Sequence, residues 1–340
     1  MKKPSVLISV LNWNNATDTI KCVDSLLATI SQDLVSVEIR VIDNGSNQAD
    51  YLKLQQSNEE RKFNITRLNE NVGFTGGHNI AIAQAIENKF DYVWLLNNDA
   101  TVEMGCLEKL VDEMEADIAL GAVSPVIAPK GGGHPHAAWG GMHKWETRQT
   151  IWFHSEREAM ETHRLRPDEI FVAGTAILLR TKAMQQIGEL DDRLFAYYDD
   201  SDLGVRLAKR NWRSKVVFNA SVEHGWRSSE QLPNYFFYLF FRNEMIFLHT
   251  HTPPQFRRFL WLKLIDQALY NANRLSLRGL QSQSDAALLG IWDFIFSNYG
   301  RPNLSRKVPA LMRLLRGASI FVYKSKLAGL EEAPEVSTAK

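Results

Sequence analysis

The amino-acid sequence predicts an α/β fold in which a mostly parallel sheet is followed by a helical C-terminal region. Compact apolar runs alternate with helix-like patterns in the first half of the chain, as expected for βαβ units. After residue 226 the apolar residues recur only with helical spacing. The 340 residues are 45% hydrophobic and 23% charged, which is typical of globular proteins and excludes global disorder.

Apolar runs bounded by polar residues predict the strands, and most precede an amphipathic stretch. The first expected strand, residues 6–11, leads into a helix in which Ile20, Val23 and Leu26 recur at helical spacing. The further expected elements are strand 37–42, helix 48–60, strand 63–68, helix 79–87, strand 92–96, strand 171–179, helix 203–210, and helices 235–248, 256–275 and 308–326. Residues 137–163 show no clear period.

The charges are distributed unevenly along the chain, although 39 basic and 39 acidic residues cancel overall. Residues 1–226 hold 24 basic and 31 acidic side chains, whereas residues 257–326 hold 12 and 3, a net charge of +9. The basic region predicts a location near an anionic membrane surface or a lipid-diphosphate acceptor. A solvated helical face and a dimer interface are the alternatives. No nucleic-acid partner is expected.

Several protein classes are disfavoured by what the sequence contains. Its two cysteines, Cys22 and Cys106, are too few for a disulfide framework, so we expect a reducing, cytoplasmic location. No apolar run approaches the roughly 20 residues that span a bilayer, since Arg242 and Glu244 interrupt the longest one. The glycine spacing from Gly73 onward matches neither the dinucleotide fingerprint nor a phosphate loop.

Polar residues follow the expected strands, where ligands bind in open α/β sheets. Asn12, Asp43 and the Asn97-Asn98-Asp99 run are such residues. Asp99 could hold a divalent cation, or could simply belong to a turn or a helix cap. His224 also follows an apolar run, and an imidazole beside a carboxylate suits a Mn²⁺-like ion.

Two further segments predict binding or catalysis. Asp199, Asp200 and Asp202 precede an expected helix, and because a helix cap accounts for only one acid, the other two indicate a function. The small residues from Gly73 to Asn79 would let backbone N–H groups approach a diphosphate.

Seven motifs in this order resemble those of inverting GT-A-fold glycosyltransferases, most of all the bacterial rhamnosyltransferase and galactofuranosyltransferase branch that builds surface polysaccharides such as O-antigen. They are LNWNN (11–15), VIDNGS (41–46), NENVGFTGGHN (69–79), YVWLLNNDATV (92–102), VAGTAILLR (172–180), LFAYYDDSDLGVRL (194–207) and VEHGWRSS (222–229). The resemblance implies a GT-A catalytic domain over residues 1–230. The helical spacing and the positive charge predict a helical basic region for acceptor or membrane association over 231–330, and the polar composition of 331–340 predicts a flexible tail.

The resemblance also implies roles for individual residues. Asn12 and Asn14 would lie near the base or ribose of a nucleotide sugar, and Asp43 would bind the pyrimidine edge. Gly73, Asn79 and Asn98 would belong to the donor pocket. Asp99, the sole acid of a D-x-D-like motif, would bind Mn²⁺ or Mg²⁺ together with His224. Asp200 would be the general base, supported by Asp199 and Asp202.

Inverting transfer is a single displacement, so it needs a base for the acceptor and an electrophile for the leaving group, and no enzyme nucleophile. The expected donor is dTDP-rhamnose, ahead of UDP-galactofuranose or another UDP-sugar, and the expected acceptor is a glycan or a lipid-linked diphosphate. Peripheral association with the cytoplasmic face of the inner membrane would follow. A nucleotidyltransferase is one alternative, although residues 11–18 lack its basic side chains. A catalytically inactive sugar- or membrane-binding module is the other.

Overall fold

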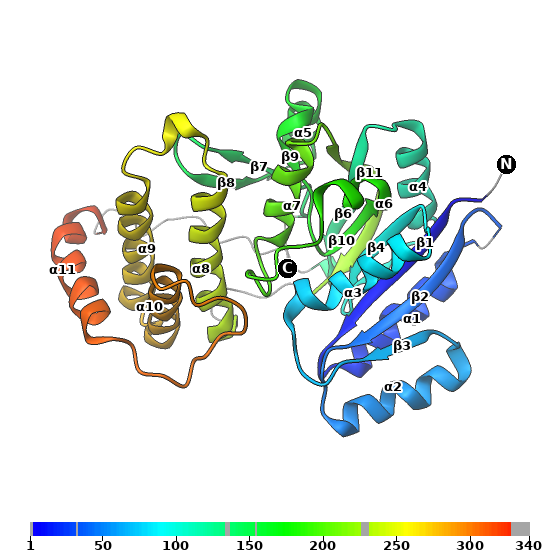
Figure 1. Cartoon of the computed structure of the whole chain (residues 1–340), viewed down its shortest axis with the longest axis horizontal. Helices are drawn as coiled ribbons and strands as arrows, with labels where there is room; N and C mark the ends of the chain where they lie inside the picture. The colour runs from blue at the N-terminus through cyan, green and yellow to red at the C-terminus, as the bar shows by residue number, and fades with distance from the viewer. Residues whose placement is uncertain (1–2, 32, 133–136, 154, 226–230, 328–340) are drawn as a thin grey trace.

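The computed structural model describes residues 3–31, 33–132, 137–153, 155–225 and 231–327. The expected tail, 331–340, and the end of the seventh motif, 226–229, lie outside these residues. Figure 1 shows a sheet flanked by helices on one side of the molecule and a separate group of helices on the other. The predicted α/β fold with a helical C-terminal region is therefore confirmed.

An eight-stranded sheet forms the centre of the N-terminal part, in the order β3-β2-β1-β4-β10-β6-β11-β5. Its strands are β1 (Ser5–Asn12), β2 (Ser36–Asp43), β3 (Asn64–Arg67), β4 (Tyr92–Asn97), β5 (Thr101–Val102), β6 (Leu120–Pro129), β10 (Ala176–Arg180) and β11 (Arg213–His224). β1 is parallel to β2 and β4, β2 to β3, and β6 to β11, whereas β10 is antiparallel to both neighbours and β5 is antiparallel to β11. The sheet is mostly parallel, as predicted.

Helices cover both faces of this sheet because its strands alternate apolar side chains between the two faces. Ile8 packs in the cluster that contains Leu26 of α1, whereas the neighbouring Leu7 packs in the cluster that contains Ile82 of α3. The helices of the N-terminal part are α1 (Ala16–Thr29), α2 (Gln48–Arg61), α3 (Gly73–Glu87), α4 (Cys106–Ala116), α5 (Glu156–Leu165), α6 (Thr181–Ile187) and α7 (Asp199–Ala208). Short 3₁₀ helices occupy Lys130–Gly132, Pro167–Glu169 and Pro254–Phe256.

The single strand predicted over residues 171–179 is wrong. The first residue of the predicted strand, Phe171, is the last residue of β9 (Ile170–Phe171). β9 joins β7 (Gly141–Lys144) and β8 (Gln149–Trp152) in a three-stranded sheet of order β8-β7-β9. The chain then turns through Val172–Thr175 and enters the large sheet as β10. The run is apolar throughout because both strands and the turn are buried.

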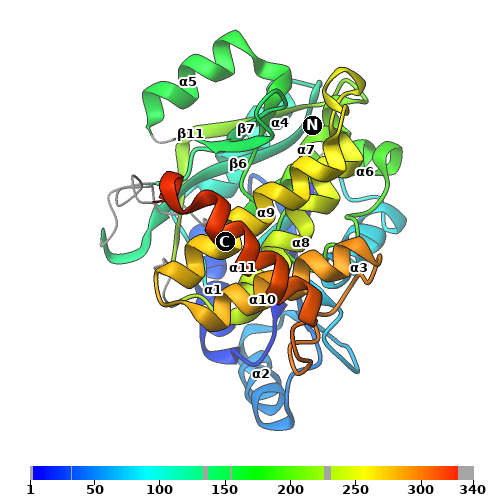
Figure 2. The ribbon, with the colours of Figure 1, turned by 90° about the vertical axis from the view of Figure 1, so that its left-hand side faces the viewer.

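Four long helices form the C-terminal part: α8 (Asn234–His251), α9 (Leu260–Leu277), α10 (Gln281–Ile295) and α11 (Ala310–Leu327). The sequence predicts α8, α9 and α11 but not α10. Figure 2 shows α9, α10 and α11 together at the end of the molecule that faces away from the sheet. They pack around their own apolar cluster, which also takes in Leu194 and Tyr198 from the chain before α7. Among the described residues, every helix is too short or too polar to cross a bilayer.

Candidate active site

A cavity of about 720 Å³ lies beside the carboxyl ends of β1 and β4. Five of the predicted site residues line it: Asn14, Gly73, Asn98, Asp99 and His224. The C-terminal part closes the opposite wall with Tyr235 and Leu239 of α8 and with Arg301, Pro302 and Leu304 from the chain between α10 and α11. The site is thus shared between the two parts of the molecule.

Asp99 and His224 converge on this cavity from the ends of two different strands. Asp99 follows β4 and His224 ends β11, and the His224 Nε2 atom lies 3.0 Å from Asp99 Oδ1. The His224 side chain is 5% exposed and that of Asp99 is 35% exposed, so the pair presents its carboxylate to the cavity. Asn97 contributes a side-chain nitrogen 3.2 Å from the same imidazole atom.

The donor set of this pair fits a divalent cation. The described residues contain no cluster of three or more His, Cys, Asp and Glu side chains able to hold a metal, so Asp99 and His224 form a two-residue site. Mg²⁺ and Mn²⁺ are commonly held by one or two protein ligands, with substrate phosphate oxygens and water completing the coordination. A carboxylate and an imidazole at the edge of an open cavity suit such binding.

Asn12 and Asp43 lie at the ends of the paired strands β1 and β2, beneath the cavity rather than in its lining. Both are buried, and Asn12 Nδ2 lies 3.1 Å from Asp43 Oδ1. The other Asp43 oxygen accepts no hydrogen bond and lies 3.5 Å from Arg67 Nε. The side chain of Asn44, the next residue, points toward the cavity segment instead, donating to Gly73 O at 3.0 Å.

Gly73 opens α3 in a conformation that only glycine adopts readily. Its φ is +85°, and a Cβ atom would lie 2.4 Å from the carbonyl oxygen of Phe195. The same oxygen accepts hydrogen bonds from the N–H groups of Phe74 at 2.6 Å and Thr75 at 3.2 Å. The glycine therefore lets the N-terminus of α3 dock against the chain that leads to the acidic helix α7.

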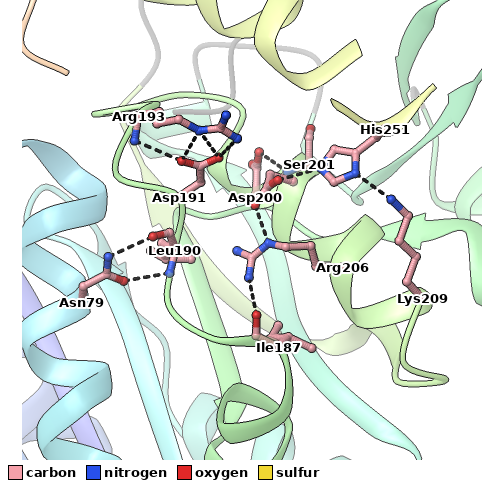
Figure 3. A network of polar contacts seen from close by, with 11 residues as sticks. Asn79, Ile187, Leu190, Asp191, Arg193, Asp200, Ser201, Arg206, Lys209 and His251 are labelled. Atoms are coloured by element: carbon pink, nitrogen blue, oxygen red, sulfur yellow. Dashed lines mark hydrogen bonds and ion pairs between the residues drawn. The ribbon is translucent and has the colours of Figure 1, made fainter. Parts of the chain in front are cut away.

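Asn79 does not line the cavity but fixes another part of that chain. Its side-chain amide donates to Leu190 O at 2.9 Å and to Asp192 Oδ1 at 2.7 Å, and its own oxygen accepts from Leu190 N at 2.8 Å. Figure 3 shows the paired contacts between Asn79 and Leu190. All side-chain polar atoms of Asn79 are thus used within the protein.

Asp200 lies in the first turn of α7, is buried, and is held by backbone donors. Its Oδ1 atom accepts from Ser201 N at 2.8 Å, and its Oδ2 atom accepts from Gly174 N at 3.2 Å. The carbonyl oxygen of Thr175, which follows Gly174, accepts a hydrogen bond from Asn97 N at 2.9 Å. The turn between β9 and β10 therefore connects Asp200 to the strand end that carries Asp99.

Asp202 is engaged differently from Asp200. Its two oxygens lie 2.7 Å from His251 Nε2 and 2.7 Å from Arg206 Nε. Lys209 Nζ lies 3.0 Å from the other His251 nitrogen (Figure 3). Burial alone raises the pKa of the Asp202 carboxyl, but the hydrogen bond from His251 and the charge of Arg206 outweigh it and leave that pKa lowered. Asp202 ties α7 to the end of α8. Asp199, also buried, is its neighbour in the same turn.

The sequence did not reveal that α8 shapes the chain just before the acids. Residues 193–198 include three non-glycine residues with positive φ: Phe195 (65°), Tyr197 (69°) and Tyr198 (66°). Asn243 donates to the carbonyls of Leu194, Ala196 and Tyr197 at 2.8, 2.7 and 3.0 Å. These bonds hold a strained segment in place.

Arg242 completes this support from the same helix. Its guanidinium is fully buried and donates to the carbonyls of Arg193 at 3.0 Å, Leu194 at 3.1 Å and Gly300 at 2.7 Å. A buried guanidinium whose N–H groups donate to backbone carbonyls favours one arrangement of the chain around it, because any other arrangement would leave the charge without hydrogen bonds. The only available signal was the polar Arg-Asn-Glu interruption of an apolar helix.

The predicted acids Asp199, Asp200 and Asp202 are not in the cavity lining, but the three residues Phe195–Tyr197 just before them are. A mostly parallel sheet with a cavity at its strand ends and a carboxylate after β4 is the arrangement of an α/β glycosyltransferase of the GT-A type. The chain belongs to glycosyl transferase family 2, whose model matches residues 5–188. The chain is therefore a glycosyltransferase, which sets aside both alternatives raised from the sequence.

Two kinds of relatives support this assignment. The chain is 30% identical over 213 residues to an N-acetylglucosaminyl-diphospho-decaprenol L-rhamnosyltransferase of Mycobacterium tuberculosis, a match that covers 55% of this chain and 66% of that protein, just under two thirds of its length. Similar solved structures include the mannosyltransferase PcManGT from Pyrobaculum calidifontis in complex with GDP-Man and Mn²⁺ (TM-score 0.55, 17% identity, 97% and 84% of the two chains). Another is S. aureus TarS 1-349 (TM-score 0.55, 13% identity, 95% and 88%). At these identities the structures support the fold alone.

Proposed function

We propose that the protein is a metal-dependent inverting glycosyltransferase that transfers rhamnose from dTDP-rhamnose to a lipid-diphosphate-linked glycan during surface-polysaccharide synthesis. The observation that carries this proposal is the convergence of the Asp99–His224 pair with the turn that holds Asp200. The rhamnosyl specificity and the lipid-linked acceptor are supported by the mycobacterial rhamnosyltransferase relative. UDP-sugars are the next candidate donors.

The donor nucleotide would occupy the part of the cavity lined by Asn14, Asn98 and Gly73. Amide side chains of this kind donate and accept hydrogen bonds and suit a ribose or a pyrimidine. Asp43, buried at the end of β2 with one oxygen 3.5 Å from Arg67 Nε, would complete recognition of the base. Asn12 and Asn79 would act by holding Asp43 and the 190–192 segment.

Asp99 and His224 would hold Mn²⁺ or Mg²⁺, which supplies charge stabilisation to the leaving diphosphate when bound. The PcManGT and GalNAc-T7 structures, both with Mn²⁺, support this choice of cofactor. The contact of Asn97 Nδ2 is with the same Nε2 atom that faces Asp99, so metal binding by this nitrogen would replace that contact.

Asp200 would act as the general base. As the acceptor hydroxyl oxygen forms its bond to the anomeric carbon, its proton passes to an Asp200 carboxylate oxygen. The bond from the anomeric carbon to the diphosphate oxygen breaks in the same step, and the diphosphate leaves with the electron pair, so the configuration inverts. Asp202, paired with His251 and Arg206, would stay ionised and support the helix, as would Asp199.

A donor panel tests this function. The full chain is incubated with dTDP-rhamnose, UDP-galactofuranose and other UDP-hexoses in Mn²⁺ or Mg²⁺, with a short-chain prenyl-diphospho-N-acetylglucosamine as acceptor. The expected result is acceptor-dependent release of the nucleoside diphosphate, highest with dTDP-rhamnose. The anomeric configuration of the transferred sugar should be inverted relative to the donor. Release of nucleotide from none of these donors contradicts the proposal.

A further inference from the structure

The cavity has an uneven distribution of charge along its wall. Among the described residues that line it, Arg301 is the one lysine or arginine, whereas the strand-end side carries Asp99. Arg301 comes from the chain between α10 and α11, on the wall contributed by the C-terminal part. A guanidinium at the rim of a sugar-transfer cavity suits an anion with several oxygens, of which a diphosphate is the most fitting here.

The backbone that carries Arg301 is held in place by the residue before it. Gly300 accepts a hydrogen bond from the buried Arg242 guanidinium at 2.7 Å, and its N–H donates to Arg193 O at 3.3 Å. Both contacts join the Arg301 segment to the chain that precedes the acidic helix α7. Arg301 is therefore placed relative to the catalytic side of the cavity, although its side chain is exposed.

The donor and the acceptor could each supply a diphosphate to Arg301, and the geometry favours the acceptor. The metal pair that would receive the donor diphosphate lies at the ends of β4 and β11. Arg301 lies in the part of the lining that the C-terminal part contributes. If the metal pair takes the donor diphosphate, Arg301 is the cationic side chain of the described lining that is left for the acceptor diphosphate.

We propose that Arg301 binds the diphosphate of a polyprenyl-diphosphate-linked acceptor. The inference rests on the proposed function but concerns binding alone. It assigns the two diphosphates of the reaction to separate places in one cavity: the donor's at Asp99 and His224, and the acceptor's at Arg301.

The test measures binding of farnesyl diphosphate to the full chain by isothermal titration calorimetry, with dTDP and Mn²⁺ at saturation. The wild type should bind the probe while dTDP is bound. Arg301→Gln should weaken that binding about tenfold or more, because a charge-assisted hydrogen-bond pair is lost. Its affinity for dTDP and its melting temperature should be unchanged. Lys307→Gln removes an exposed charge from the same segment outside the cavity lining, and should leave probe binding unchanged.

Each other outcome overturns the assignment. Displacement of the probe by dTDP would mean a single diphosphate site, and weaker dTDP binding in Arg301→Gln would move Arg301 to the donor. If Arg301→Gln and Lys307→Gln weaken probe binding equally, the probe is attracted by the overall positive charge and not bound by Arg301. Unchanged probe affinity in Arg301→Gln, or absence of probe binding to the wild type, would also refute it. The binding test involves no sugar transfer, so its result can be interpreted even if the donor panel gives no turnover.

Discussion

The side-chain amide of Asn243 lies 2.7 Å from the carbonyl oxygen of Ala196, three residues before the first acid of α7. The same amide also reaches the carbonyls of Leu194 and Tyr197. A residue of the C-terminal helices thus shapes the backbone that precedes the proposed catalytic acids. The expected boundary at residue 230 does not separate the parts of the cavity, and Leu194 and Tyr198 belong to the apolar cluster of the C-terminal helices.

Replacement of Asn243 tests this positioning. Asn243→Leu keeps a similar volume but removes the donor to the carbonyls of Ala196 and Tyr197 and the acceptor of Arg242 Nε, so we expect a loss of about 2–4 kcal/mol in the free energy of unfolding. The turnover of the remaining folded molecules should also fall, because Asp199 and Asp200 follow directly on the loosened segment. Denaturant unfolding and transfer rate are measured on one preparation. Thr250→Leu, exposed on the same helix, is the control that should change neither quantity.

The metal site gives a second prediction. Asp99→Ala and His224→Ala should each abolish or strongly reduce turnover, and EDTA should do the same to the wild type, with recovery on addition of Mn²⁺. Isothermal titration with Mn²⁺ in the presence of the nucleotide checks the binding step directly. Asp112→Ala, an exposed acid on α4, should behave as the wild type. Full activity in EDTA would leave Asp99 with a structural role.

Asp200 and Asp202 should respond differently to the same substitution. Asp200→Asn keeps the shape but cannot accept the proton, so transfer should fall by roughly 10²–10⁴-fold with little change in nucleotide affinity. Asp202→Asn breaks the pairing with His251 and Arg206, so it should chiefly lower the melting temperature. Near-wild-type transfer by Asp200→Asn would refute its role as base and direct the search to Asp199.

The start of α9 provides a test of membrane association. Arg257, Arg258 and Lys263 surround Phe259 and Leu262, which are 61% and 68% exposed. We expect co-sedimentation with vesicles that rises with anionic lipid and falls with salt, because apolar insertion and charge attraction add. Leu262→Ser should weaken it, and Leu165→Ser, equally exposed on α5, should not. Identical recovery in the supernatant with and without anionic vesicles would contradict the prediction.

Glu244 gives a pH-dependent prediction. Burial raises the pKa of this carboxyl from 4.5 to about 7, although a hydrogen bond from Tyr198 opposes the shift. The folded state therefore binds the proton more tightly than the unfolded state, and stability is lost as pH rises from about 4.5 to about 7. Glu244→Gln should raise the free energy of unfolding by about 1–2 kcal/mol at pH 8 and have little effect at pH 5. Equal effects at both pH values would argue against a titrating Glu244.

The sequence predicted the parallel half of the sheet well because strands covered on both faces are continuous apolar runs, as in residues 92–96. The same reasoning failed at residues 171–179, where the buried turn around Gly174 is as apolar as the strands that it joins. Helix α3 begins at Gly73 rather than at Asn79, because its glycines serve close packing, Gly73 against Phe195 and Gly77 against Leu11, instead of forming a loop.

The site was predicted only in part for a related reason. Polar residues at strand ends are visible in the sequence, and the cavity does contain Asn98, Asp99 and His224. The partners of Arg242 and Asn243 lie about fifty residues earlier in the chain, where no local pattern connects them. Their polarity was interpreted only as an interruption of an apolar run.

The burial of Arg242 also limits how this enzyme can be taken apart or recombined. Its guanidinium donates to carbonyls of Arg193 and Leu194 on one side and of Gly300 on the other. In a helical fragment expressed alone, the charge would lose the first set of acceptors and face solvent or an apolar core. A chimaera that joins residues 1–230 to the helices of another transferase would need the same Arg-Asn pair in the same register. If Arg301 binds the acceptor as proposed, acceptor specificity would be altered by substitutions around Arg301 rather than by exchange of the whole helical region.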